Sequence, residues 1–418
     1  MASLKMAQCL PLVMLTALAL HGFAQDTPQA MRAYEIFREL VMRFVDNRPP
    51  AQRHIQILRS KDRLQPAAPA EFPCAAAARA PWRRSAERPT SAHRVRPGDV
   101  DVVAAMGDSL SVGYGLAATK LTEVFIEARG WSFSAGGQGT WREFLTLPNI
   151  LKEFNPNLTG YAVQDALTHQ KASRFNVAEG GAISSDLPLQ ARNLVKRMRV
   201  DPDVDLQNDW KMVTLMIGSN DFCGFVCLEE DMNATVRRHG EDLERALDHL
   251  QASLPRTIVN LIVTPNLESL MNVTHLWPQC YVTHRVECWC LFGSKYKARR
   301  REVVKIMRLW QLEERRVATS ERYRQKEDFV VNLQPMVEFV VIPKKGNRSD
   351  LNFLSEDCFH LSQKGIALGA NGLWMNLLES DDEKSTTLPD PAFSRFLCPT
   401  EERPFISTWG NNGGRGPS

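Results

Sequence analysis

The chain has 418 residues, of which 44% are apolar and 24% are charged, and its formal net charge is +3. A chain of this length and composition can bury a large core, which excludes a wholly disordered protein. The small net charge gives no reason to expect binding to nucleic acid.

Residues 1–24 have the pattern of a signal peptide. Lys5 precedes an apolar run over residues 9–20, and the small residues Gly22 and Ala24 suit cleavage near Ala24. The run is too short to span a membrane, and no later stretch reaches about 18 apolar residues. The polar sequence 413–418 has no anchor pattern. We therefore expect a secreted, soluble protein.

The cysteine count favours an oxidising compartment. Removal of Cys9 with the signal peptide leaves an even number of cysteines, as disulfide pairing requires. They are Cys74, Cys223, Cys227, Cys280, Cys288, Cys290, Cys358 and Cys398. A zinc site built from Cys280, Cys288 and Cys290 is the alternative, although the usual paired spacing is absent. The sequence does not determine which cysteines pair.

Four sequons give mild further support for passage through the secretory pathway. The predicted glycosylation sites are Asn157, Asn233, Asn272 and Asn347.

The N-terminal part of the mature chain has few features of a folded domain. Residues 31–46 have the apolar spacing of an amphipathic helix. Residues 62–99 are rich in Ala, Pro and Arg and indicate a linker or an irregular covering segment, in which we expect 75–89 to be disordered. The boundaries that follow are a signal peptide (1–24), an N-terminal segment (25–95), a main domain (96–380) and a tail (381–418).

From residue 100 onward, strand and helix patterns alternate. We predict strands over 101–106, 174–178, 212–217, 257–263 and 329–333. We predict helices over about 141–151 with an interruption near Pro148, and over 184–199, 232–253, 296–326 and 362–378, with a cysteine-bearing loop over 272–294. The basic residues of 296–326 indicate a solvated face, with a membrane-docking patch as the alternative. Alternation of this kind predicts a five-stranded parallel sheet in a three-layer α/β/α sandwich.

Four short polar blocks follow these predicted elements. They are Gly107–Leu110, Asn176–Gly181, Gly218–Asp221 and Asp357–His360. Three follow the first three strands and the fourth follows the fifth strand. Because the carboxyl ends of parallel strands meet at one edge of a sheet, we expect the blocks to gather there.

Each block supplies a different part of an acyl-transfer site. Ser109 is a candidate nucleophile, which requires a base such as His360. Asp357, three residues before His360, can orient the imidazole. The Ser109 amide, the Gly181 amide and the Asn220 side chain are candidate oxyanion-hole donors.

Taken singly, these blocks have simpler explanations. Gly107–Leu110 and Asn220–Asp221 are common turn sequences, and Asp357 suits the amino end of a helix. Asp108 is expected to be structural, through hydrogen bonds within its turn. The order of all four blocks, each at a position that faces the crevice, is what favours catalysis.

These blocks resemble those of the SGNH, or GDSL, hydrolases, in which Ser109, Gly181, Asn220 and His360 stand at the four naming positions. The flanking sequences 93–100, 176–188 and 357–362 resemble the membrane-associated phospholipase B branch of that family. The resemblance implies a flavodoxin-like sandwich and a serine esterase, without metal or cofactor, that acts on acyl esters of phospholipids and lysophospholipids at membrane or micelle surfaces.

Larger members of that branch have tandem repeats and a C-terminal membrane span, whereas this chain has one unit. Membrane anchoring is therefore not carried over. The alternatives are a carboxylesterase of the same superfamily acting on another ester, and a secreted binding protein that keeps the fold without catalysis.

Overall fold

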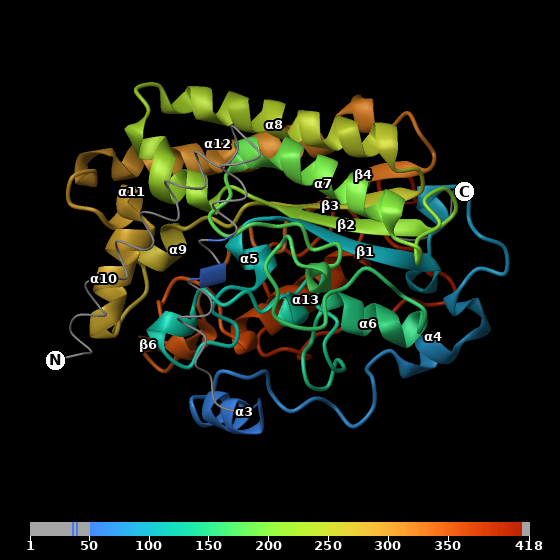
Figure 1. The fold of residues 1–418 in the computed structure, drawn as a ribbon, viewed down its shortest axis with the longest axis horizontal. Coiled ribbons are helices and arrows are strands. Elements are labelled where there is room, and N and C mark those ends of the chain that lie inside the picture. Colours follow the sequence, from blue (N-terminus) through green and yellow to red (C-terminus); the bar gives the residue numbers. More distant parts are fainter. Residues whose placement is uncertain (1–35, 37–38, 41–50, 412–418) are drawn as a thin grey trace.

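A four-stranded parallel sheet lies between two layers of helices in the computed structural model, which describes Ile36, Glu39, Leu40 and residues 51–411 (Figure 1). The strands are β1 (Val100–Gly107), β2 (Trp210–Met216), β3 (Thr257–Ile262) and β4 (Phe329–Gln334). They lie in the order β1-β2-β3-β4, and each neighbouring pair is parallel. The predicted three-layer α/β/α sandwich is confirmed.

The sheet has four strands rather than the predicted five, because residues 174–178 do not form a strand. Asn176 makes only an isolated parallel bridge with Ala105, on the outer edge of β1. Thr159 makes a second isolated bridge with Val102 on the same edge. Two separate segments therefore share the edge of β1, and neither pairs over enough residues to extend the sheet.

Helices α7 (Leu187–Val200), α8 (Met232–Ser253) and α12 (Arg300–Ala318) cover one face, and α5 (Ser109–Val112), α6 (Leu147–Phe154) and α13 (Gln363–Asn376) lie on the other (Figure 1). Smaller elements surround this sandwich. They are α3 (Ala51–Ser60), α4 (Ala75–Arg79), α9 (Glu268–Met271), α10 (Pro278–Glu287), α11 (Trp289–Phe292) and the hairpin of β5 (Lys344–Lys345) and β6 (Arg348–Ser349).

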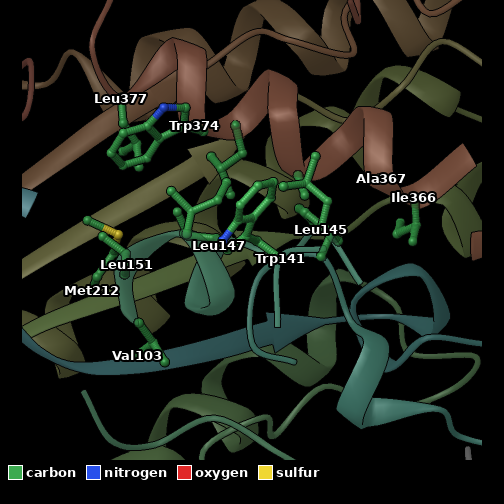
Figure 2. Packing of buried hydrophobic residues seen from close by; sticks show 14 of the residues in the cluster. Val103, Trp141, Leu145, Leu147, Leu151, Met212, Ile366, Ala367, Trp374 and Leu377 are labelled. Atoms are coloured by element: carbon green, nitrogen blue, oxygen red, sulfur yellow. The ribbon is translucent and has the colours of Figure 1, made fainter. Parts of the chain in front are cut away.

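Alternate residues of the strands enter two separate cores, because successive side chains of a strand point to opposite faces. Val102, Ala104 and Met106 join the core under α7, α8 and α12. Val103 and Met212 join the other core, where Leu147 and Leu151 of α6 and Trp374 of α13 pack (Figure 2). All four strands are almost wholly buried, as the near-continuous apolar runs predicted.

Helix α6 begins where the sequence predicted an interruption. Pro148 lies in its first turn, where the missing amide hydrogen costs nothing, and the side chain of Thr146 accepts a hydrogen bond from the amide of Asn149. Helix α8 has the predicted bounds. Helix α12 is shorter than the predicted 296–326, since short 3₁₀ turns flank it on both sides.

Two segments predicted to be irregular are folded. The cysteine-bearing stretch 272–294 contains α10 and α11, so the prediction of a loop there was wrong. The stretch 75–89, expected to be disordered, contains α4 and a 3₁₀ turn, and Ala77 and Ala78 are buried in the core. A disulfide also links Cys74 to Cys398 in the C-terminal tail, and this cross-link could not be predicted from composition.

All eight cysteines of the described chain form disulfides. The bridges are Cys74–Cys398, Cys223–Cys288, Cys227–Cys290 and Cys280–Cys358. The three cysteines of the alternative zinc site are therefore each bonded to another sulfur.

The predicted signal peptide, most of the predicted helix over 31–46 and the last seven residues lie outside the described residues. Within the part that is described, no helix combines the length and the apolar character needed to cross a membrane.

Candidate active site

Ser109 is the first residue of α5, directly after the turn that ends β1. Gly107 has φ +141°, and a Cβ atom at this position would lie 2.1 Å from the carbonyl oxygen of Met216 on the neighbouring strand. Only glycine therefore fits this turn. Asp108 caps α5, since its carboxylate accepts a hydrogen bond from the amide of Leu110 at 3.0 Å. The turn therefore places Ser109 at the edge of the sheet formed by the carboxyl ends of the strands.

The structure brings Ser109, His360 and Asp357 together. Nε2 of His360 lies 2.8 Å from Oγ of Ser109, and Nδ1 of the same ring lies 2.6 Å from Oδ2 of Asp357. With the proton on Nδ1, the ring donates to Asp357 and accepts from the hydroxyl of Ser109. All three side chains are buried, so the geometry is that of an activated serine.

Asp357 is ionised in this environment. Burial acts to raise its pKa, but the charge of His360, the hydrogen bond to that ring and the amides of Phe359 and His360 together hold the pKa below its usual value. Both amides donate to Oδ1 of Asp357 at 3.1 Å. A carboxylate held in this way fixes the tautomer of the imidazole.

Helix α10 holds the turn that carries Asp357 and His360. Cys358, with φ +61°, lies between them and is bonded to Cys280 of α10. Thr283 Oγ1 donates to the carbonyl of Asp357 at 2.5 Å, and Nε2 of His284 lies 2.8 Å from the carbonyl of Cys358. Sequence reasoning missed these contacts because it predicted a loop at this position.

The two remaining blocks meet at the same edge of the sheet. The amide of Glu179 donates to Gly107 at 3.1 Å, and Nδ2 of Asn220 donates to the carbonyl of Ala182 at 2.9 Å. Gly181, with φ +83°, lies in the loop between these two bonds. Because a side-chain amide has two N–H donors, Asn220 retains one for another acceptor.

A second serine–histidine pair lies behind this loop. Oγ of Ser184 is 2.8 Å from Nδ1 of His239, whose Nε2 is 3.5 Å from Oε1 of Glu314. The exposed fractions of Ser184 and His239 are 3% and 0%. This pair joins the loop of Gly181 to α8 and α12.

Residues 103–373 match the family described as GDSL-like lipase/acylhydrolase. The chain belongs to this family. The match begins within β1 and covers β2, β3 and β4. It includes Ser109, Gly181, Asn220 and His360, which were predicted from the order and position of the four blocks.

Curated relatives of this GDSL chain include two membrane-associated proteins named phospholipase B1. The Homo sapiens protein is 37% identical over 337 residues, which cover 79% of this chain and 22% of that protein. The Mus musculus protein is 38% identical over 335 residues, which cover 78% of this chain and 22% of that protein. This chain therefore spans about a fifth of the length of the relatives.

A solved phospholipase A1 from Streptomyces albidoflavus NA297 is 15% identical and covers 64% of this chain and 95% of its own. Its TM-score is 0.29, which is too low to support an argument from structure.

An apolar pocket opens beside the GDSL serine. Leu110, which follows Ser109, lines it together with Phe359 and Leu361, which flank His360. The cavity has a volume of about 90 Å³. Sequence reasoning missed the pocket, because its walls come from residues scattered between positions 110 and 388.

Glu287, at the end of α10, is a further carboxyl group near the site. Both of its carboxyl oxygens are buried without a hydrogen-bond partner, and one ligand atom from each of Glu287, Asp357 and His360 lies within 4.8 Å of the others. Burial, followed by the charge of Asp357, raises the pKa of Glu287 well above its usual value. Asp357, and not Glu287, is the carboxyl group within hydrogen-bonding distance of the imidazole.

The four predicted glycosylation sites lie on the surface. Asn157, Asn233, Asn272 and Asn347 are all exposed, so each is accessible to modification. Glycosylation itself stays a prediction.

Asp108 is expected to make stability depend on pH. Burial raises the pKa of Asp108 to about 6, against an ordinary value of 3.8. Because the pKa of Asp108 is higher in the folded than in the unfolded state, between these two values the folded protein binds more protons than the unfolded chain. The free energy of unfolding therefore falls by about 3 kcal/mol as the pH rises from the lower value through the higher one. Urea unfolding at pH 4 to pH 7 measures this loss. We expect it in the wild-type protein and not in Asp108→Asn, whose side chain at this position cannot titrate. Parallel pH curves for the two proteins would contradict it.

Proposed function

We propose that the protein is a serine esterase that hydrolyses acyl esters of phospholipids and lysophospholipids through an acyl-enzyme. The observation that carries the proposal is the continuous chain of hydrogen-bonding contacts from Ser109 through His360 to Asp357. Membership of a family of lipases and acylhydrolases supports the reaction class. The names of the phospholipase B1 relatives support the substrate class.

In the first half of the proposed reaction, Nε2 of His360 takes the proton of Ser109 as Oγ attacks the ester carbonyl carbon. The resulting imidazolium is stabilised by the carboxylate of Asp357. His360 then gives the proton to the departing alcohol oxygen, which for a phospholipid is a glycerol oxygen. The acyl group remains on Ser109.

In the second half, His360 removes a proton from water, which attacks the acyl carbonyl carbon. Collapse of the second tetrahedral intermediate returns the proton to Ser109 and releases the fatty acid. Water and ester are the only reactants, so the steps balance without a metal or a cofactor.

The oxyanion of each intermediate is proposed to accept hydrogen bonds from the amides of Ser109 and Gly181 and from the side chain of Asn220. We expect Asn220→Ala to lower kcat by about 10²–10³-fold, the usual cost of removing one such donor, with KM little changed. Steady-state kinetics on a soluble ester measure both quantities. Thermal unfolding serves as the control, because the variant also loses the bond to Ala182. An unchanged kcat would remove Asn220 from the oxyanion hole.

The apolar pocket favours a fatty acyl group over a polar one. The test is release of fatty acid from phosphatidylcholine and lysophosphatidylcholine, measured above and below the micelle threshold, beside a short-chain ester and an acetylated sugar. We expect the lipids to be cleaved and the rate to rise at the micelle threshold. Cleavage of the sugar ester alone would instead indicate a carboxylesterase acting on another substrate.

We further propose that the enzyme acts after export from the cell. The four disulfides support this, since such bridges persist in oxidising compartments. Mass spectrometry of the protein from culture medium tests it, through cleavage near Ala24 and glycans at the four sequons.

A further inference from the structure

The apolar pocket extends away from the catalytic residues along helix α13. Helix α13 begins directly after Ser362, two residues beyond His360. Its residues Ile366 and Gly369 line the pocket, as does Leu388 from the tail. With a rise of about 1.5 Å per residue, Gly369 lies about 10 Å along the helix from Ser362. Apart from Ser269, every side chain of the lining is apolar.

Three glycines lie within α13, and their surroundings differ. A Cβ atom at position 365 would lie 2.3 Å from the carbonyl oxygen of Phe353, which cannot move easily, and one at position 372 would lie 2.7 Å from Cδ2 of Leu388, whose side chain would have to shift. A Cβ atom at position 369 would contact only Cδ1 of Ile366, at 4.0 Å. The backbone of Gly369 is helical and its φ is not positive. Neither sterics nor backbone conformation therefore requires glycine at this position.

Glycine destabilises a helix interior relative to alanine, so an unexplained glycine in α13 needs another reason. The position is buried and faces the empty apolar pocket. Any larger side chain there would extend into that space. The space is lined as a hydrocarbon chain requires. Its lining includes Leu110, Phe359 and Leu361, which are sequence neighbours of Ser109 and His360.

We propose that Gly369 keeps the inner part of the pocket open for the acyl chain of the substrate and so sets the upper limit of acyl length. This inference rests on the proposed esterase function and adds the residue that determines specificity. The chain's own packing leaves the space beside Gly369 empty, and the substrate's methylene groups fill it.

The test compares wild type with Gly369→Leu on p-nitrophenyl esters of two to sixteen acyl carbons. We expect kcat/KM of the variant to fall by about 10–100-fold on the longest esters, since even one misplaced methylene in an apolar pocket changes discrimination by about this factor. The two-carbon and four-carbon esters, which do not reach position 369, should be cleaved as by wild type. An unchanged profile over chain length would overturn the inference.

Two further variants cover the case in which Gly369→Leu does not fold. Gly369→Ala adds one methyl group without a clash, so we expect a higher melting temperature together with a modest shift towards shorter esters. Leu388→Ala enlarges the same end of the pocket and should shift the profile towards longer esters. If neither variant shifts the profile, Gly369 does not set acyl length. If wild type cleaves no ester at all, the proposed function fails instead.

Discussion

Replacing Ser109 with Ala is expected to lower kcat for fatty-acid release from lysophosphatidylcholine by about 10⁴–10⁶-fold. Without Oγ the acyl-enzyme cannot form, and only binding and the oxyanion donors remain to assist direct attack by water. The cavity left by one oxygen atom is small, and the cap on α5 comes from Asp108, so the fold should persist. The loss is measured as the rate of fatty-acid release by Ser109→Ala at enzyme concentrations up to the micromolar range, where a slow reaction can still be detected.

Two neighbouring serines provide matched controls. Ser111 lies on the same helix and is fully buried, and Ser184 contacts a different histidine, His239. We expect Ser111→Ala and Ser184→Ala to retain labelling by a fluorophosphonate probe, and Ser109→Ala to lose it completely. If Ser109→Ala were still labelled, another residue would be the nucleophile. If the wild-type protein failed to react with the probe, it would be a binding protein without catalysis.

The second large effect is expected at Asp357. We expect Asp357→Asn to lower kcat by about 10⁴-fold, because an amide at this position favours the wrong tautomer of His360 and cannot stabilise the imidazolium. Size and shape are nearly unchanged, so KM should change much less.

Asp108 is the matched control for that experiment. Its carboxyl group is also buried, and its pKa responds to the charge of His360, but its hydrogen bond is to the amide of Leu110. Asparagine caps a helix as well as aspartate does, so Asp108→Asn should retain most of the activity. If the two variants lost activity equally, the acid of the site would not be Asp357 alone.

The core of the fold was predictable because each strand is buried on both faces. Such strands are largely apolar, and β1, β2, β3 and β4 stand out as short apolar runs between polar turns. The stretch 174–178 was predicted as a strand, yet it shares the edge of β1 with a segment around Thr159, and each makes only an isolated bridge there. How two segments divide one strand edge is a tertiary effect that local composition does not contain.

Segments held by disulfides were the least predictable. The stretch 75–89 has a composition typical of disorder, and 272–294 lacks the apolar period of a helix. Both are fixed by cross-links, through Cys74 in the first case and through Cys280, Cys288 and Cys290 in the second. The sequence predicted that disulfides exist, but pairing depends on distances that only the folded chain has.

The convergence of the candidate site was predictable, because topology alone brings the ends of parallel strands together. That rule accounts for Ser109 after β1 and Asn220 after β2, whereas Asp357 and His360 come more than 20 residues after the end of β4 and are brought to Ser109 by a turn held against α10. The loop of Gly181 and the side chain of Asn220 lie at the same edge. The shape of the pocket was not predictable, since it depends on how side chains from many elements pack.

The bond between Cys280 and Cys358 joins the turn of the imidazole to a helix outside the sandwich. A newly made chain in which these sulfurs are still reduced would lack that covalent link, and the contacts of Thr283 and His284 would have to hold the turn against α10. Formation of the disulfide is therefore expected to fix the position of the imidazole relative to Ser109.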